Sequence, residues 1–321
     1  MAGAETQPQR GSLVKRARGL MRYATRSARR RLTTRKTPAG MAANALFGEG
    51  HVLLIDYPPT ALEEPRYGYG RPPHPRLSEL LGRGDGDYAG VLEEFKPYAD
   101  DLLAIRVEES DPREPRWRNG YLFGLDGVSL YCFTRKYAPR RYMEIGSGNS
   151  TLFVDRARRD GGIDMEIVSL DPYPRREIDA VCDRVVREPI ESTNLDMFDE
   201  LRSGDIVFLD GTHRVFMNSD AVVFFLDVLP ELPPGVLVGI HDIHLPDDYR
   251  PDHADRHYSE QYLLASYLLA ESPWIRPMLP CWYVSHHPQL GGAAGSLLPE
   301  AVRQARSPHG VIFWLMTQPR P

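Results

Sequence analysis

Short apolar runs alternate with amphipathic stretches from residue 141 to the end of the chain. Continuous apolar runs are typical of strands buried on both faces, and apolar residues that recur every three or four positions are typical of helices. Strands that alternate with helices form a parallel sheet covered on both sides. The pattern therefore predicts an α/β fold with a doubly wound, mostly parallel sheet. Strands are predicted at 141–146, 165–171, 183–188, 205–210, 235–241, 278–285 and 310–317, and helices at 150–159, 194–202, 219–229 and 258–271.

The chain before residue 141 has a different pattern. Pro and Gly are frequent up to residue 86, with one candidate strand at 51–56, and helical patterns follow at 88–107 and 125–137. We therefore divide the chain into three parts. These are a tail at 1–36 that is disordered or amphipathic-helical, an N-terminal extension at 37–116 that is a candidate substrate lid, and a main domain at 117–321.

Charge is divided unevenly between the tail and the rest of the chain. Eleven of the 39 Lys and Arg residues lie in residues 1–36, but only one of the 44 Asp and Glu residues does. The rest of the chain is therefore acidic. We do not expect it to bind nucleic acid, because neutralising phosphates requires a basic surface.

In the basic tail, apolar residues such as Leu13, Leu20 and Met21 recur at helical spacing among the arginines. A basic amphipathic helix of this kind can lie on an anionic membrane surface. The same composition also describes a mitochondrial transit peptide or a solvated, disordered arm. The excess of Arg over Lys favours a bacterial protein and argues against the transit peptide. Peripheral membrane contact and the disordered arm both stay open.

The cysteines and the apolar runs indicate the compartment. No apolar run reaches the roughly 20 residues that cross a bilayer, and the sequence has no signal-peptide core. Cys132, Cys182 and Cys281 lie far apart and form neither a disulfide framework nor a zinc pattern. We expect reduced thiols and a cytoplasmic protein, peripheral to the inner membrane if the tail binds lipid.

The first strand after residue 140 ends in an acid and a glycine-rich turn. The segment reads Glu144-Ile-Gly146-Ser147-Gly148-Asn-Ser150-Thr151. Two glycines between a strand and a helix N-terminus let backbone N–H groups approach a ligand without a Cβ in the way. The next strand ends in Asp171, where a carboxylate can bond a ribose diol. The pair predicts a nucleoside cofactor.

The spacing of the glycines distinguishes between nucleoside cofactors. A dinucleotide fingerprint requires a third glycine or alanine where this chain has Thr151. The segment instead resembles motif I of the class I S-adenosylmethionine (SAM) methyltransferases. The resemblance implies a Rossmann-like, seven-stranded, mostly parallel sheet with an antiparallel last strand, and SAM as the cofactor. It implies cofactor-binding roles for Glu144, Gly146, Ser147, Gly148, Ser150, Thr151, Asp171 and Asp210.

Two later strands end in acids and histidines. The first leads into Asp210-Gly-Thr-His213 and the second into His241-Asp242-Ile-His244. Carboxylate and imidazole together suit a divalent cation such as Mg²⁺ or Mn²⁺, or a general base. Methyl transfer to an alcohol requires the oxygen to lose its proton. A histidine can take it directly, or a metal can lower the pKa of the alcohol. The residues leave both routes open.

Residues 117–317 resemble metal-dependent O-methyltransferases of sugars and catechols, which carry metal-binding acids at these two strand ends. The resemblance implies Asp210 and Asp242 as metal ligands, with His241 as a third. The pair His241-Asp242 departs from the usual adjacent acids or Asp-Asn. The base candidates are His213, His241 and His244, with His213 ahead of the others.

The predicted function is SAM-dependent O-methylation of a small-molecule or glycan acceptor, such as a sugar, glycolipid or natural product. Glu260 and Gln261 begin a helix near the site and are candidates to bond sugar hydroxyls, or to stabilise the helix N-terminus. An oligomer is compatible with the sequence. The alternatives are an NAD(P)-dependent oxidoreductase, an inactive SAM-fold scaffold and, less well supported, a metal-dependent hydrolase.

Overall fold

The computed structural model describes residues 64–321, apart from 109–110, 175, 177, 305–308 and 321. All of these belong to one compact unit, Ala61–Pro321. The amphipathic tail, the candidate strand at 51–56 and the first third of the candidate lid, 37–63, lie outside the described residues. No helix in the described part of the chain is long and apolar enough to cross a membrane.

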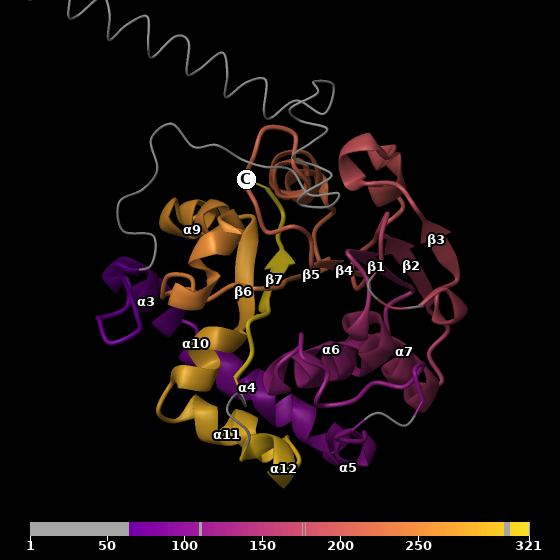
Figure 1. Ribbon diagram of the computed structural model, residues 1–321, viewed down its shortest axis with the longest axis horizontal. Coiled ribbons are helices and arrows are strands. Elements are labelled where there is room, and N and C mark those ends of the chain that lie inside the picture. The colour runs from indigo at the N-terminus through magenta and orange to yellow at the C-terminus, as the bar shows by residue number, and fades with distance from the viewer. Residues whose placement is uncertain (1–63, 109–110, 175, 177, 305–308, 321) are drawn as a thin grey trace, which may run out of the picture. The chain divides into compact units, whose positions relative to one another are not determined.

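A seven-stranded sheet runs through the described unit (Figure 1). Its order is β3-β2-β1-β4-β5-β7-β6, and every neighbouring pair is parallel except the two that β7 makes with β5 and β6. This confirms the predicted α/β sheet with an antiparallel last strand. The strands are β1 (Arg141–Ile145), β2 (Glu166–Leu170), β3 (Arg184–Val186), β4 (Ile206–Leu209), β5 (Leu237–Ile240), β6 (Ile275–Pro280) and β7 (Phe313–Thr317).

Helices cover both faces of the sheet. In Figure 1, α6 and α7 lie on one side, with α4 beyond them. Two predicted helices are shorter than expected: 194–202 holds only a 3₁₀ turn at Leu195–Phe198, and 219–229 begins as α8 and continues as a π turn at Phe224–Val228. The helices are α3 (Pro75–Gly82), α4 (Asp85–Phe95), α5 (Ala99–Ala104), α6 (Gly124–Tyr137), α7 (Asn149–Gly161), α8 (Asp220–Val223), α9 (Glu260–Leu269), α10 (Cys281–His286), α11 (Leu290–Ser296) and α12 (Glu300–Arg303).

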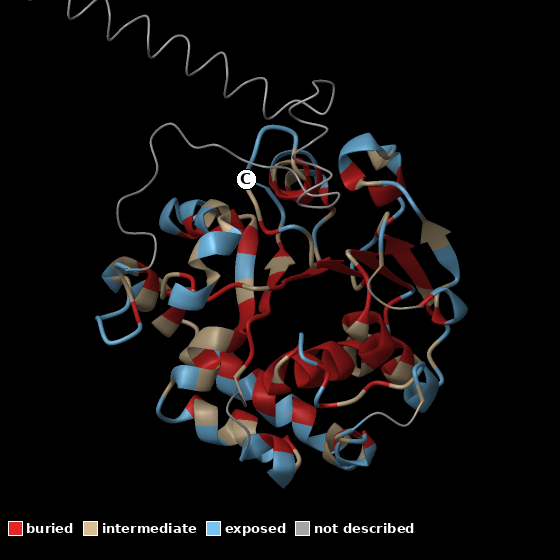
Figure 2. Cartoon of the chain, in the orientation of Figure 1, coloured by how far each residue is buried: buried red, intermediate tan, exposed pale blue. Residues whose placement is uncertain are grey.

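Alternate residues of the strands enter two separate cores. Tyr142 and Phe208 pack with α4, α6 and α7, whereas Met143 and Val207 pack with α3 and α9 on the opposite face. Side chains that alternate between two buried faces are what a helix-covered sheet requires. Figure 2 accordingly shows the central strands β1, β4 and β5 and most of α6 in the colour of buried residues. Since α4 belongs to the first core, residues from the end of the N-terminal extension help to form the main domain.

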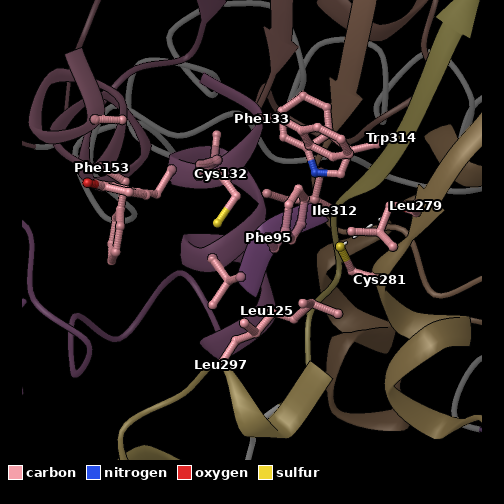
Figure 3. Close-up of a cluster of buried hydrophobic side chains, with 14 of the residues drawn as sticks. Phe95, Leu125, Cys132, Phe133, Phe153, Leu279, Cys281, Leu297, Ile312 and Trp314 are labelled. Atoms are coloured by element: carbon pink, nitrogen blue, oxygen red, sulfur yellow. Dashed lines mark hydrogen bonds between the residues drawn. The ribbon is translucent and has the colours of Figure 1, made fainter. Parts of the chain in front are cut away.

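The first core is rich in aromatic residues (Figure 3). Phe133 of α6 packs against Phe95 of α4 and Trp314 of β7, with ring centroids 5.0 Å apart in each pair. The indole N–H of Trp314 donates to Ser129 Oγ at 2.8 Å, so the one polar atom of that ring has a partner. The three cysteines are free thiols, in agreement with the sequence.

The strand predicted at 278–285 is wrong in its second half. Strand β6 ends at Pro280, and the following residues form α10. Trp, Tyr and Val favour a strand by local propensity. In the folded chain, helical spacing instead buries Cys281 and Val284 together, while Tyr283 donates to Asp85 at 2.8 Å. Packing of one helical face overrides the local preference.

Substituting Gly239 with Ala is expected to destabilise the sheet. Gly239 lies in β5, and a Cβ there would be 2.7 Å from Trp314 and 2.8 Å from Phe208. Overpacking a core of this kind costs about 1–3 kcal/mol. Urea unfolding of Gly239→Ala measures the loss. Gly90→Ala, in α4 with nothing within 4 Å of its added Cβ, is the control and should not lose stability. Equal stability of both variants with the parent would contradict the packing.

Candidate functional site

The predicted site residues follow the carboxyl ends of four adjacent strands. Gly146 follows β1, Asp171 follows β2, Asp210 follows β4 and His241 follows β5. Strand order reverses at β1, which has β2 on one side and β4 on the other. Open α/β sheets bind ligands outside the strand ends at such a reversal. The topology therefore places one site at this edge of the sheet.

The glycine turn lies directly against the end of β4. Gly146 has a φ of +80°, and a Cβ there would lie 1.9 Å from the carbonyl oxygen of Asp210. Only glycine fits such a close approach. A Cβ at Gly148 meets nothing within 4 Å, so the backbone that leads into α7 borders open space. This is the side on which a ligand has access to the N-terminus of the helix.

Glu144 supports the turn from below. Its side chain is fully buried and accepts bonds from the hydroxyls of Thr151, at 2.6 Å, and Ser150. Thr151 Oγ1 in turn accepts the backbone N–H of Gly148 at 3.1 Å. Burial raises the pKa of Glu144 to about 8, although the two hydroxyls lower it. These residues hold one another, and direct contact of Glu144, Ser150 and Thr151 with the cofactor stays a prediction.

Asp171 joins the end of β2 to the glycine turn. One carboxylate oxygen accepts the backbone N–H of Ser147 at 2.8 Å, and the other accepts that of Tyr173 at 2.8 Å. The hydroxyl of Ser147 bonds that of Ser169 at 2.8 Å. The carboxylate thus lies beside the turn, where the sequence places a ribose contact.

Two histidines and two carboxylates converge at the ends of β4 and β5. His213 Nε2 lies 3.3 Å from Asp210 Oδ1 and 3.4 Å from Asp242 Oδ2. His241 Nδ1 lies 3.1 Å from Asp210 Oδ1 and 3.9 Å from Asp242 Oδ1. His213 and Asp242 have φ values of +61° and +55°, a region costly for residues other than glycine and frequent at functional sites. The structure therefore assembles Asp210, His213, His241 and Asp242.

The charges of this group are strongly coupled. Burial lowers the pKa of His213, but Glu260 and Asp210 outweigh it and hold that pKa well above its usual value. Burial likewise lowers the pKa of His241, and Asp210 and Asp242 raise it by more, to about 9. Without a bound cation, the neighbouring carboxylates therefore favour the doubly protonated, charged form of both rings. The side chain of Asp210 is 24% exposed and each ring 5%, so ligands reach the group from the carboxylate side.

The donor set fits a divalent cation. In the described part of the chain, Asp210, His213 and His241 form the one group of side chains suited to a metal, with ligand atoms within 4.8 Å of one another. Asp242 lies beside them. The sequence resemblance implied Asp210, His241 and Asp242, and the structure adds His213. Two imidazoles with two carboxylates suit Mn²⁺ better than Mg²⁺, which prefers oxygen ligands.

His244 lies outside the converging group. Its side chain is fully buried, both ring nitrogens lack a hydrogen-bond partner, and the ring packs 4.8 Å from that of Trp282. Burial lowers the pKa of His244 to about 3. This ring is therefore neutral, and its role as a base stays a prediction with no contact in the structure to support it.

Glu260 and Gln261 are placed differently from the substrate contacts that the sequence suggested. Both side chains are fully buried. Glu260 Oε1 lies 2.5 Å from His213 Nδ1. Gln261 Oε1 accepts the backbone N–H of His244 at 2.9 Å, which fixes the loop after β5. Neither side chain reaches a surface that an acceptor could contact, because each is used inside the fold.

Sequence reasoning missed Asp126 altogether. It lies in the first turn of α6, is fully buried, and has its Oδ2 4.0 Å from His241 Nε2. Nothing in the sequence marks it, because an acid at the start of a helix is usually read as complementing the helix dipole.

One family model and several solved structures are similar to parts of this chain. Residues 143–243 match the family model described as "Methyltransferase domain". A search of curated proteins finds no match. Solved structures with a similar chain include the O-methyltransferase TomG from Streptomyces achromogenes, with 15% identity, a TM-score of 0.38, and 77% of this chain and 99% of that one covered. An O-methyltransferase from Bacillus cereus is 17% identical, with a TM-score of 0.36. The match covers 76% of this chain and 96% of that one.

The strand order and the family match support one conclusion. The sheet has seven mostly parallel strands and an antiparallel last strand, as the resemblance to class I enzymes implied. The matched segment runs from β1 to just beyond β5 and so contains the glycine turn, Asp171 and the group around Asp210. Residues 143–243 therefore match a methyltransferase domain, and the sheet around them has the form expected of class I SAM-dependent methyltransferases.

Proposed function

We propose that the chain transfers the methyl group of SAM to a hydroxyl oxygen of its acceptor, with a divalent cation bound by Asp210, His213, His241 and Asp242. The main support for this proposal is that the group lies next to the glycine turn. The backbone of Asp210 packs against Gly146, while its side chain faces the two histidines. The glycine turn that would bind the cofactor and the group of two histidines and two carboxylates therefore meet at the end of one strand, β4.

An oxygen acceptor explains why such a group is needed. A hydroxyl is a weak nucleophile until it loses its proton, whereas an amine is already nucleophilic when neutral. A bound divalent cation would lower the pKa of the acceptor hydroxyl. The carboxylates of Asp210 and Asp242 beside the two rings support this route, because imidazole and carboxylate ligands together suit a divalent cation.

The residues around this group would bind the acceptor and orient its hydroxyl. Asp210 and Asp242 present carboxylate oxygens on the accessible side, where an acceptor arrives. The buried rings of His213 and His241 fix the inner side of the group. Tyr258, whose ring lies 4.6 Å from that of His213, supplies an aromatic wall beside it. We propose a hydroxylated sugar, glycolipid or natural product as the acceptor.

The location of the protein is also a proposal. The three free thiols and the acidic main domain support a cytoplasmic bacterial enzyme. The basic tail at 1–36 would give it peripheral contact with the inner membrane.

The cofactor site is tested by titration calorimetry with S-adenosylhomocysteine (SAH). We expect Asp171→Ala to weaken SAH about 10- to 100-fold, the loss typical of hydrogen bonds to a charged group. Asp164→Ala, an exposed acid after α7, is the matched control and should bind SAH like the parent. Equal binding by parent and Asp171→Ala would contradict the ribose contact. Stabilisation by NADH and not by SAH would revive the oxidoreductase.

The reaction is tested with isotopically labelled SAM and a panel of hydroxylated sugars and phenols, with Mn²⁺ or with EDTA. We expect label in an O-methyl product only when the cation is present. Transfer that is unchanged in EDTA would contradict the cation, and label found on nitrogen alone would contradict the oxygen acceptor.

A further inference from the structure

We propose that Asp126 and Glu260 are positioning residues, one behind each histidine of the site. Each buried carboxylate faces the outer nitrogen of a ring, so that the inner nitrogens, His213 Nε2 and His241 Nδ1, point at Asp210 and Asp242. The proposal rests on the proposed function only in that the inner nitrogens would hold the cation. The contacts of the two carboxylates with the two rings do not depend on the cation.

Glu260 holds His213. Its Oε1 lies 2.5 Å from His213 Nδ1, and its Oε2 is buried with no partner among the described residues, so His213 is the one described side chain that this carboxylate bonds. The backbone reinforces the contact, since the carbonyl of His213 accepts the N–H of Ser259, at 2.7 Å, and that of Glu260, at 3.3 Å. The start of α9 is thereby fixed to the loop after β4. With Nδ1 bonded to Glu260, Nε2 is left to face Asp210 and Asp242.

Asp126 stands in the same relation to His241. Its Oδ2 lies 4.0 Å from His241 Nε2, a buried nitrogen with no hydrogen-bond partner. The opposite nitrogen, Nδ1, is the one that faces Asp210. The separation exceeds a hydrogen bond. The Asp126 carboxylate is nevertheless the acidic group that faces this buried nitrogen at 4.0 Å.

Asp126 is itself rigidly held. Its Oδ1 accepts the backbone N–H groups of Val311 at 2.7 Å and Ile312 at 2.8 Å, and its Oδ2 accepts that of Phe123 at 3.1 Å. These bonds connect the start of α6 to the segment before β7. A carboxylate with three backbone donors keeps its position when its neighbour changes, which is what a positioning residue requires.

Cation binding requires both rings to be neutral, and the two carboxylates then favour opposite tautomers. His213 would keep its proton on Nδ1 toward Glu260, and His241 on Nε2 toward Asp126. Both inner nitrogens then carry lone pairs directed at the space between Asp210 and Asp242. Carboxylates behind metal-binding histidines fix the tautomer and strengthen the ligand, and their loss typically weakens metal binding by about 10- to 100-fold.

The first test measures Mn²⁺ affinity of the full chain by electron paramagnetic resonance titration, with Mn²⁺ as the probe. We expect Asp126→Asn and Glu260→Gln each to weaken Mn²⁺ about 10- to 100-fold, while SAH affinity without metal stays close to that of the parent. Asp155→Asn is the control, because Asp155 is a buried carboxylate of α7 that pairs with Arg158 and Arg159, away from the histidines. Unchanged Mn²⁺ affinity in both site variants would overturn the proposal.

The second test reads the tautomers directly and needs neither metal nor substrate. Nitrogen-15 NMR of the histidine rings, recorded above the titration of both rings, should show the parent His213 protonated on Nδ1 and His241 on Nε2. Asp126→Asn should change the ring pattern of His241 alone, and Glu260→Gln that of His213 alone. If the parent does not bind Mn²⁺ but shows these tautomers, the proposed cation site is contradicted and the positioning roles of Asp126 and Glu260 are supported. If Mn²⁺ binds and the tautomers are unchanged in both variants, the positioning roles are contradicted and the proposed cation site is supported.

Discussion

His213→Ala is expected to lower kcat for methyl transfer by about 10²- to 10⁴-fold, because loss of a ligand of the proposed cation removes several kcal/mol of charge stabilisation, and to leave SAH binding close to that of the parent. The reason is geometric. His213 Nε2 faces both Asp210 and Asp242, whereas Nδ1 is taken by Glu260, so removing the ring disrupts the group on three sides. The glycine turn and Asp171 do not touch the ring, and the cofactor cradle should persist.

The measurement is single-turnover transfer from labelled SAM, with SAH calorimetry on the same samples. His286→Ala is the control, because His286 is an exposed histidine of α10 whose Nδ1 bonds the carbonyl of Trp282. A His213→Ala variant that retains the parent's kcat would remove this histidine from the reaction. Loss of SAH binding in parallel with activity would instead place His213 in the cofactor cradle.

Gly146→Ala is expected to abolish SAH binding and to destabilise the domain. A Cβ at this position would lie 1.9 Å from a backbone carbonyl oxygen, which has no flexible side chain to move aside. The φ of +80° adds about 1–3 kcal/mol of backbone strain for any residue with a Cβ, and overpacking adds another ~1–3 kcal/mol. Since β1 and β4 meet here, the strain falls on the cofactor turn itself.

Urea unfolding and SAH calorimetry measure both losses for Gly146→Ala. The matched control is Gly86→Ala in α4, where an added Cβ meets nothing within 4 Å. This variant should bind SAH like the parent. Wild-type SAH affinity in Gly146→Ala would contradict the close packing of the turn against Asp210.

The sequence predicted the parts of the site that depend on strand ends. Apolar runs locate β1, β2, β4 and β5, and the residues just after them therefore meet at one edge. That reasoning predicts that Glu144, Asp171, Asp210 and Asp242 meet in one cleft. It also anticipated the antiparallel β7 from resemblance.

The sequence did not predict contacts that depend on which way a side chain turns. Glu260 begins an amphipathic helix, and nothing in its spacing shows whether it faces solvent or His213. Asp126 stands 115 positions before His241 in the numbering, and only the packing of α6 against β7 brings them near. The strand predicted at 278–285 failed for the same kind of reason, because burial of Cys281 and Val284 outweighed local propensity.

The bonds from Val311 and Ile312 to Asp126 have a consequence for the order in which the protein is made. A ribosome synthesises Asp210, His213, His241 and Asp242 well before it reaches these two residues. Until they emerge, the Asp126 carboxylate lacks two of its three backbone donors, and Ile243 lacks the carbonyl of Val311, which accepts its N–H at 2.8 Å. A nascent chain, or one clipped by a protease before residue 310, would carry all four donor side chains and still lack an ordered site. The bonds that hold the Asp126 carboxylate would thus form only when the segment before β7 is in place.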